Sequence, residues 1–262
     1  MPGKSFIESS ILVEGLGRIG DLALFVVEFF KKFWRRPFEW RETFIQMDEA
    51  GSKSFILVSV TGLAIGIVLS MQSRGTLARF GAEAVLPSML ALSVFKEIGP
   101  VITSLVLAGR LGAGIGAEIG SMRVTEQIDA LEVAALRPFN YLVVTRVIAC
   151  VVVFPILTIW TDMIALTGGY LESVLASDMD YRIFFNSAFS DLRFSDLIVD
   201  TLKTSVFGFI VAIVSCFLGY NVRGGTREVG QAAMAAVVLS ALLIFLADVV
   251  IVRISITMFG GV

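Results

Sequence analysis

The sequence predicts an all-α integral membrane protein, in which an N-terminal interfacial helix is followed by five transmembrane helices. Of its 262 residues 56% are hydrophobic and only 17% are charged, which is too apolar for an ordinary soluble domain. A membrane span needs about 20 mainly apolar residues, and three runs without Asp, Glu, Lys or Arg reach that length, at 54–73, 204–222 and 229–247. Two further regions complete the five spans, namely 85–108 and the shorter run 147–161 with its flanks.

The chain is expected to have an interfacial region, 1–53, and a transmembrane domain, 54–262. Within the first region, residues 6–34 predict an amphipathic helix that does not cross the bilayer, because polar residues recur along one stripe at helical spacing. The stripe consists of Glu14, Arg18, Asp21 and Glu28. A basic and aromatic cluster suited to anionic headgroups follows it, with Lys31, Lys32, Trp34, Arg35, Arg36 and Trp40. A soluble helix packed on a partner subunit is the alternative.

The first two spans are expected at about 55–71 and 85–107, joined by a loop at 72–83. Gly62, Gly66 and Ser70 recur every four residues in the first span, which allows another helix to approach closely. At the exit of this span, Met71, Leu77 and Phe80 are apolar residues that either line a cavity or simply pack.

A charged, helix-favouring segment, 112–138, separates the second span from the third. Its residues Glu126, Asp129 and Glu132 are three positions apart, so they are expected along one side of a helix. Gly112, Gly116 and Gly120 extend a ribbon of small residues from the second span and predict tight helix packing. Since a plain connection could be far shorter, the segment is interpreted as a docking element on one side of the bilayer.

The remaining spans follow in order. The third is expected from Leu142 to about Leu166, bent or loosened at Pro155. Residues 178–200 predict a pair of surface helices on the bilayer. The fourth and fifth spans are expected at 202–220 and 229–251, joined by a short glycine-containing turn.

Positive charge predicts the orientation. If the N-terminus is cytoplasmic, 14 Lys and Arg fall in the inner segments and six in the outer ones, with Lys96 left out as intramembrane. The charged segment at 112–138 would then be cytoplasmic, and the C-terminus would lie outside.

Several functions are excluded by composition. The chain has no histidine, and its two cysteines, Cys150 and Cys216, lie inside apolar runs, so they are interpreted as packing residues and no metal site is expected. No basic run indicates nucleic acid. A phosphate-binding Walker loop is also missing, since Gly3–Lys4–Ser5 has no room before it for the required glycine. The chain is therefore not expected to be an enzyme, and any ATP hydrolysis must occur on another polypeptide.

Lys96 and Glu97 are charges about ten residues into the second span, near the middle of the bilayer by the helical rise of about 1.5 Å per residue. Charges at that depth are unfavourable in free energy unless they are paired or hydrated. Pro100 has no N–H to bond the carbonyl of Lys96, so that acceptor is expected to be free. The two residues either form a polar site in a central cavity or pair structurally with Arg110, Asp248, Arg253 or a second copy.

The run from Lys96 to Pro138, KEIGPVITSLVLAGRLGAGIGAEIGSMRVTEQIDALEVAALRP, strongly resembles the permeases of the MlaE family of ABC lipid transporters. The resemblance extends over about 45–259 and includes Gly219–Tyr220–Asn221 and Asp248. It implies a homodimer in the bacterial inner membrane that moves phospholipids to or from a periplasmic carrier with an MCE domain. It also implies a cytoplasmic ATPase that binds ATP and Mg²⁺, and allows for a small STAS-domain protein on that ATPase.

The resemblance also implies roles for residues. A coupling helix would match about Ala117–Glu132, with ATPase contacts from Glu118, Arg123, Glu126, Asp129 and Glu132. The lipid cavity would be lined by Lys96, Glu97, Met71, Leu77 and Phe80, with Lys96 attracting a lipid phosphate.

The sequence disfavours three other classes of protein. An ion-coupled secondary transporter would use Lys96, Glu97 and Asp248 as a relay, but the odd number of spans and the lack of visible inverted repeats disfavour it. A membrane scaffold has no need for charges inside a span. An intramembrane enzyme is disfavoured by the absence of histidine and of paired acid–base carboxylates.

Overall fold

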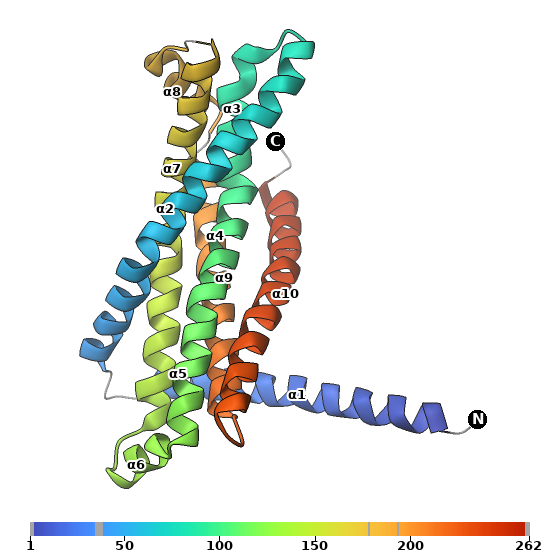
Figure 1. The fold of residues 1–262 in the computed structure, drawn as a ribbon, viewed down its shortest axis with the longest axis vertical. Helices are drawn as coiled ribbons and strands as arrows, with labels where there is room; N and C mark the ends of the chain where they lie inside the picture. The colour runs from blue at the N-terminus through green and yellow to red at the C-terminus, as the bar shows by residue number, and fades with distance from the viewer. Residues whose placement is uncertain (1–2, 35–38, 178, 193, 260–262) are drawn as a thin grey trace.

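The computed structural model describes the chain except for residues 1–2, 35–38, 178, 193 and 260–262, and shows a bundle of long helices (Figure 1). The described residues contain no strand. Five of their helical stretches are long and apolar enough to cross a membrane, which confirms the number of predicted spans. These stretches are Trp40–Arg79, Glu83–Val124, Phe139–Ser177, Asp200–Tyr220 and Thr226–Thr257.

Helix α1 (Gly3–Phe33) lies across one end of the bundle, at a steep angle to the other helices (Figure 1). It is attached by aromatic packing, because Phe25 and Phe29 are buried. The ring of Phe25 lies 5.0 Å from that of Phe139, and Lys32 Nζ lies 4.3 Å from the centroid of the same Phe139 ring. The side chains of Glu14, Arg18, Arg35 and Arg36, which the sequence analysis singled out, lie outside the described residues.

Helices α2 (Trp40–Arg79) and α7 (Thr145–Ser177) pack along each other over much of their length. The contact is close because α2 presents glycine. A Cβ built on Gly62 would lie 2.7 Å from the carbonyl oxygen of Thr161, and one on Gly66 would lie 1.8 Å from that of Ala165. Helix α2 begins at Trp40, well before the expected start near 55, because the polar residues before the apolar run continue the same helix. Helix α7 continues through Pro155.

The second span is one composite helix from Glu83 to Val124. It comprises a 3₁₀ turn (Glu83–Val85), α3 (Leu86–Ser93), a π turn (Val94–Ile98), α4 (Gly99–Leu107), a second π turn (Ala108–Gly112) and α5 (Ala113–Val124). In the first π turn the Gly99 N–H bonds to the carbonyl of Val94, five residues earlier. This wide turn immediately precedes Pro100, which has no N–H to continue the ladder.

The charged segment at 112–138 is therefore not a separate helix, contrary to the sequence interpretation. Its first half, α5, continues the second span, because Gly112, Gly116 and Gly120 let α5 pack against α9 and α10. Only after a turn at Thr125 and Glu126 does a short helix, α6 (Gln127–Val133), begin.

Of the two surface helices predicted at 178–200, only the first is a separate helix. One separate helix, α8 (Tyr181–Ser190), is present, and it packs on α3 with Phe184 fully buried instead of lying alone on the bilayer. The second half of the segment already belongs to α9 (Phe194–Tyr220). A turn then leads to α10 (Thr226–Phe259), which stands at one side of the bundle with only 17% of its most apolar window buried.

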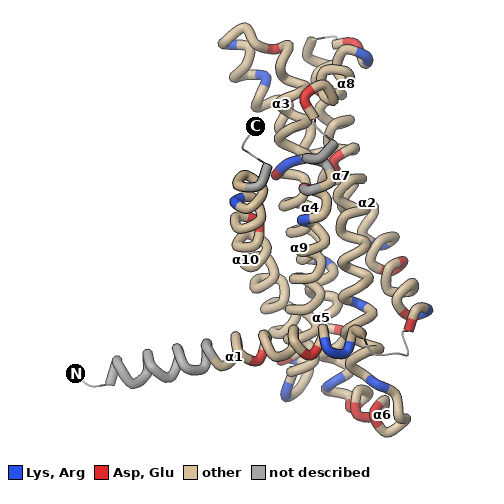
Figure 2. The backbone as a smooth tube through the Cα atoms, turned by 180° about the vertical axis from the view of Figure 1, so that it is seen from behind, with Lys and Arg blue, Asp and Glu red and all other residues tan. Residues whose placement is uncertain are grey.

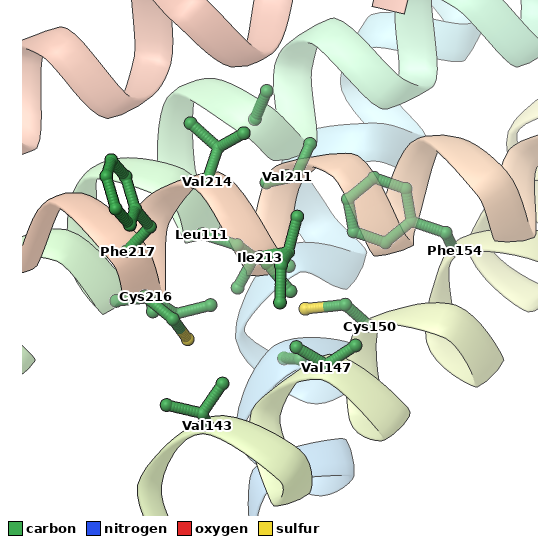
Figure 3. Packing of buried hydrophobic residues seen from close by; sticks show 14 of the residues in the cluster. Leu111, Val143, Val147, Cys150, Phe154, Val211, Ile213, Val214, Cys216 and Phe217 are labelled. Carbon is green, nitrogen blue, oxygen red and sulfur yellow. The ribbon is translucent and has the colours of Figure 1, made fainter. Parts of the chain in front are cut away.

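A continuous apolar core joins α5, α7 and α9 at the lower half of the bundle. Cys150 and Cys216 are buried in it, among Val147, Ile213 and their neighbours (Figure 3). Both thiols are free, as expected for residues that only pack. This core fixes the positions of the charged side chains at both of its ends.

Candidate functional site

A cluster of charged side chains is centred on Lys203 of α9, whose side chain is only 1% exposed. Its Nζ lies 3.3 Å from Glu97 Oε2 and 3.3 Å from Asp248 Oδ1. It also lies 3.9 Å from Asp200 Oδ1, one turn earlier on the same helix. The cluster thus joins the composite second span to α9 and α10.

Lys203 also donates to the backbone carbonyl of Lys96, at 2.5 Å. This carbonyl is the acceptor that Pro100 leaves without an N–H in the helix. The lysine therefore satisfies a backbone group that would otherwise be costly in an apolar environment. Pro100 and Lys203 together hold the wide turn at Val94–Ile98 in place.

More than one carboxylate lies around the buried ammonium group of Lys203. Glu97 and Asp248 face Lys203, and their side chains are 47% and 16% exposed, so Glu97 is accessible from outside the bundle. Asp162 of α7 is buried beside Gly99, and within the described residues its Oδ1 has no hydrogen-bond partner. Lys96 is partly exposed on the same turn as Glu97. The cluster therefore has a buried cationic centre and an accessible edge with both signs of charge.

The cluster lies near the start of α9, far from the other end of that helix. Lys203 precedes Tyr220, the last residue of α9, by 17 residues, which is about 25 Å along a helix. Tyr220 lies at the end of the bundle where α1 and α6 are, since its ring is 6.3 Å from that of Phe25 on α1 and it lines a pocket with Glu132 of α6.

Of the apolar residues predicted at the exit of the first span, Met71 and Leu77 are on the last turns of α2, and Phe80 directly follows that helix. Met71 and Phe80 are 59% and 80% exposed, and Leu77 is partly exposed. Within the described part of the chain, Met71 and Phe80 are both largely exposed. They offer an apolar surface near the end of the bundle that carries the Lys203 cluster.

A second group of charged residues surrounds the turn between α5 and α6. Glu126 has a left-handed backbone, with φ of 58°, and it precedes the first residue of α6. It is therefore not on one helix with Asp129 and Glu132, contrary to the prediction. Asp129 accepts from Arg123 across the turn at 2.6 Å, and Glu118 accepts from Arg146 of α7 at 2.7 Å.

The short helix α6 also has an apolar side. Ile128 is fully buried against the core and attaches α6 to the bundle. Val133 and Leu136, by contrast, are 90% and 51% exposed at the end of α6 and just beyond it. The end of the bundle that carries the turn between α5 and α6, called the foot of the bundle below, thus presents charged and apolar side chains together. Most of the described residues along the spans are uncharged (Figure 2).

Sequence reasoning missed three of these features. Lys203 falls at the start of the expected fourth span and was not identified as a site residue, although its spacing of three from Asp200 was a usable signal for a buried charge. Arg146 was counted only for orientation. Val133 and Leu136 gave no signal, because exposure depends on where α6 turns.

The five long apolar helices indicate the class of multi-pass helical membrane proteins. A family model described as Permease MlaE matches residues 43–254, so the chain belongs to the MlaE permease family. It is accordingly an ABC transporter permease, the class of membrane subunit that works with a separate ATPase.

Individual relatives agree with this assignment. The chain is 38% identical over 233 residues to a probable ABC transporter permease protein of Rickettsia felis, covering 89% of this chain and 90% of the relative. It is 33% identical over 217 residues to the intermembrane phospholipid transport system permease protein MlaE of Haemophilus influenzae, covering 82% of each. It is 38% identical over 216 residues to the chloroplastic protein TRIGALACTOSYLDIACYLGLYCEROL 1 of Arabidopsis thaliana, covering 81% of this chain and 61% of the relative.

Proposed function

We propose that this chain is the permease subunit of an ATP-driven transporter that moves phospholipids between the bacterial inner membrane and a periplasmic carrier with an MCE domain. The observation that carries the proposal is membership of the MlaE family over 43–254, with a relative named for intermembrane phospholipid transport. The chain itself binds no cofactor in this proposal, and ATP and Mg²⁺ are bound by the partner ATPase.

The lipid site in this proposal is the accessible edge of the Lys203 cluster. Glu97 is half-exposed there, Lys96 is on the same turn, and Met71 on α2 and Phe80 just after it present apolar surface. A phospholipid needs both kinds of surface, with a cation for its phosphate and apolar side chains for its acyl chains. Lys203 keeps the turn rigid, so that Lys96 and Glu97 have a fixed position.

The ATPase in this proposal docks on the turn between α5 and α6. The exposed side chains of Val133 and Leu136 provide apolar contact, and Glu126 and Glu132 provide charge that sets register. This end of the bundle would be cytoplasmic, in agreement with the excess of Lys and Arg there. A small STAS-domain protein would bind the ATPase and not this chain.

A second copy of the chain is the remaining membrane partner. The apolar face of α10 is exposed at Met234, Val238, Leu242, Leu246 and Val249, which recur at helical spacing. A homodimer would cover part of this face and enclose the accessible edge of the charged cluster. Helix α1 would lie in the cytoplasmic interface, and the C-terminus would be periplasmic, on the side of the carrier.

The proposal is tested by reconstitution. In vesicles with the ATPase and the carrier, labelled phospholipid is expected to move only when ATP is added, and Lys96→Asp is expected to slow this movement about tenfold because it replaces the cation that faces the phosphate. Arg182→Asp, on the exposed side of α8, is the matched control and should leave the rate unchanged. Transport by the chain alone, driven by a proton or sodium gradient, would overturn the proposal.

Docking of the ATPase is tested by charge reversal at the foot of the bundle. The pair Glu126→Lys and Glu132→Lys is expected to reduce co-purified ATPase several-fold, and Val133→Asp to reduce it further, because the apolar contact contributes more affinity than rim charges. The control pair Glu83→Lys and Asp191→Lys makes the same change of charge on exposed residues elsewhere in the bundle. Full recovery of ATPase with all three foot substitutions would rule out this docking surface.

A further inference from the structure

A pocket of about 240 Å³ lies at the foot of the bundle, between α2, α5 and α7. It is separate from the Lys203 cluster, because Arg110, which lines it, follows Lys96 by 14 residues, or about 21 Å along the composite helix. Figure 1 shows why there is space here: the first half of α2 tilts away from the other helices toward this end.

The pocket crosses the expected boundary of the bilayer. Ser54 is the first residue of the long uncharged run of α2, and Arg110 Nη1 donates to its hydroxyl. Gln46 and Glu49, which also line the pocket, belong to the polar segment before that run. One side of the pocket is therefore at the level of lipid headgroups, and the other is at the level where acyl chains begin.

The back of the pocket is formed by Arg146, whose side chain is 3% exposed. Its Nη1 donates to the carbonyl of Leu142 at 3.0 Å, and its Nη2 donates to Glu118 Oε1 at 2.7 Å. Its Nε is buried and, among the described residues, has no acceptor. A buried guanidinium with an unmet donor is unfavourable, and it is strongly attractive to a further anionic group nearby.

The residues that line the pocket carry equal numbers of positive and negative charges. Arg110 and Arg146 contribute two guanidinium groups, and Glu49 and Glu118 contribute two carboxylates that are largely accessible. Glu49 also pairs with Lys53 on the exposed side of α2, an i,i+4 pair of the kind that contributes little. Leu111, Ile115 and Ala149 form an apolar wall.

We propose that this pocket binds the headgroup of a zwitterionic phospholipid. Arginine binds phosphate through its forked donors, and a carboxylate at the rim suits the ammonium group of the same headgroup. The apolar wall continues toward the membrane-spanning part of α2 and accommodates the start of an acyl chain. An anionic phospholipid would place its charge beside Glu49 and Glu118 with no ammonium group to compensate, and so would bind more weakly.

This site does not depend on the transport function proposed above, because it uses none of the residues of the Lys203 cluster. The ligand is a lipid and not a free phosphoethanolamine in this proposal, since Leu111, Ile115 and Ala149 give the pocket an apolar wall. The expected specificity follows from the charge balance, and changing that balance should change the preferred lipid.

The test uses the purified full chain incubated with equal amounts of phosphatidylethanolamine and phosphatidylglycerol that have the same acyl chains. Native mass spectrometry is expected to show an excess of bound phosphatidylethanolamine. Glu49→Lys should shift the ratio of the two bound lipids toward phosphatidylglycerol on the order of tenfold, because it removes a carboxylate and adds a cation. Asp48→Lys is the matched control, since it changes the charge of the chain equally on a neighbouring exposed residue that does not line the pocket.

The same measurement in a Lys96→Asp background separates this site from the proposed transport site. The shift between Glu49→Lys and Asp48→Lys should persist there, whether or not Lys96 itself affects transport. Equal lipid ratios in the two variants would overturn the inference, as would an excess of phosphatidylglycerol on the unmodified chain. Displacement of the bound lipid by an excess of free phosphoethanolamine would overturn its assignment to a lipid.

Discussion

Replacing Lys203 with Met is expected to lower the free energy of unfolding by about 3–5 kcal/mol, the range measured when one partner of a buried ion pair is removed. The loss is large because this one ammonium group serves Glu97, Asp248 and the carbonyl of Lys96. Such a loss is a large fraction of the stability of an ordinary protein. Thermal unfolding of the purified chain in detergent, followed by size-exclusion chromatography, measures it.

Two comparisons show whether charge is the cause. Lys53→Met removes an exposed lysine from its pair with Glu49 and is expected to cost less than about 1 kcal/mol. Adding Glu97→Gln and Asp248→Asn to Lys203→Met removes the unpaired carboxylates and should restore part of the lost stability. If Lys203→Met unfolds at the same temperature as the unmodified chain, the cluster contributes no net stability and the argument is wrong.

Gly66→Ala is expected to destabilise the chain by about 3 kcal/mol or more, the upper range for overpacking a tight contact. The added methyl group would lie 1.8 Å from the backbone oxygen of Ala165, and a backbone atom cannot move aside as a side chain can. The helices α2 and α7 would have to separate along their whole contact. Thermal unfolding of the purified variant measures this effect.

Gly75→Ala is the matched control, because Gly75 is on the same helix and a Cβ there would meet nothing within 4 Å. In a helix this change is expected to stabilise by about 0.5–1 kcal/mol, through the lower backbone entropy of alanine in the unfolded chain. Equal stability of Gly66→Ala and Gly75→Ala would show that α2 and α7 do not approach as closely as described.

The number and order of the spans could be predicted from the sequence, because a span is defined by local length and polarity. The runs at 54–73 and 229–247 each lie inside one observed helix, and the run at 204–222 extends two residues beyond the end of α9. The ends of the helices could not be predicted in this way. The polar residues before 54 continue α2, and the charged residues after 112 continue the second span, because polar residues form helices as readily as apolar ones when packing supports them.

The charged sites were only partly predictable for a related reason. Pro100 alone predicts that the carbonyl of Lys96 lacks its usual backbone N–H partner, since the missing N–H is a local fact. Its partner, Lys203, is 107 residues away, and only the tertiary structure brings the two together. The left-handed conformation of Glu126 was also unpredictable, because that region of the backbone is normally left to glycine or asparagine. The conformation breaks the helix on which three acidic residues were expected.

The composite second span has a mechanical consequence. Between Lys96 and Val124 it runs for 28 residues, or about 42 Å, without leaving a helical path. If a rod of that length tilts by about 5° around one end, its other end moves by about 4 Å. This displacement is larger than the distance of 2.5 Å between Lys203 Nζ and the carbonyl oxygen that it binds. A small displacement beside α6 is therefore sufficient to break that bond, unless the wide turn at Ala108–Gly112 bends and absorbs the motion.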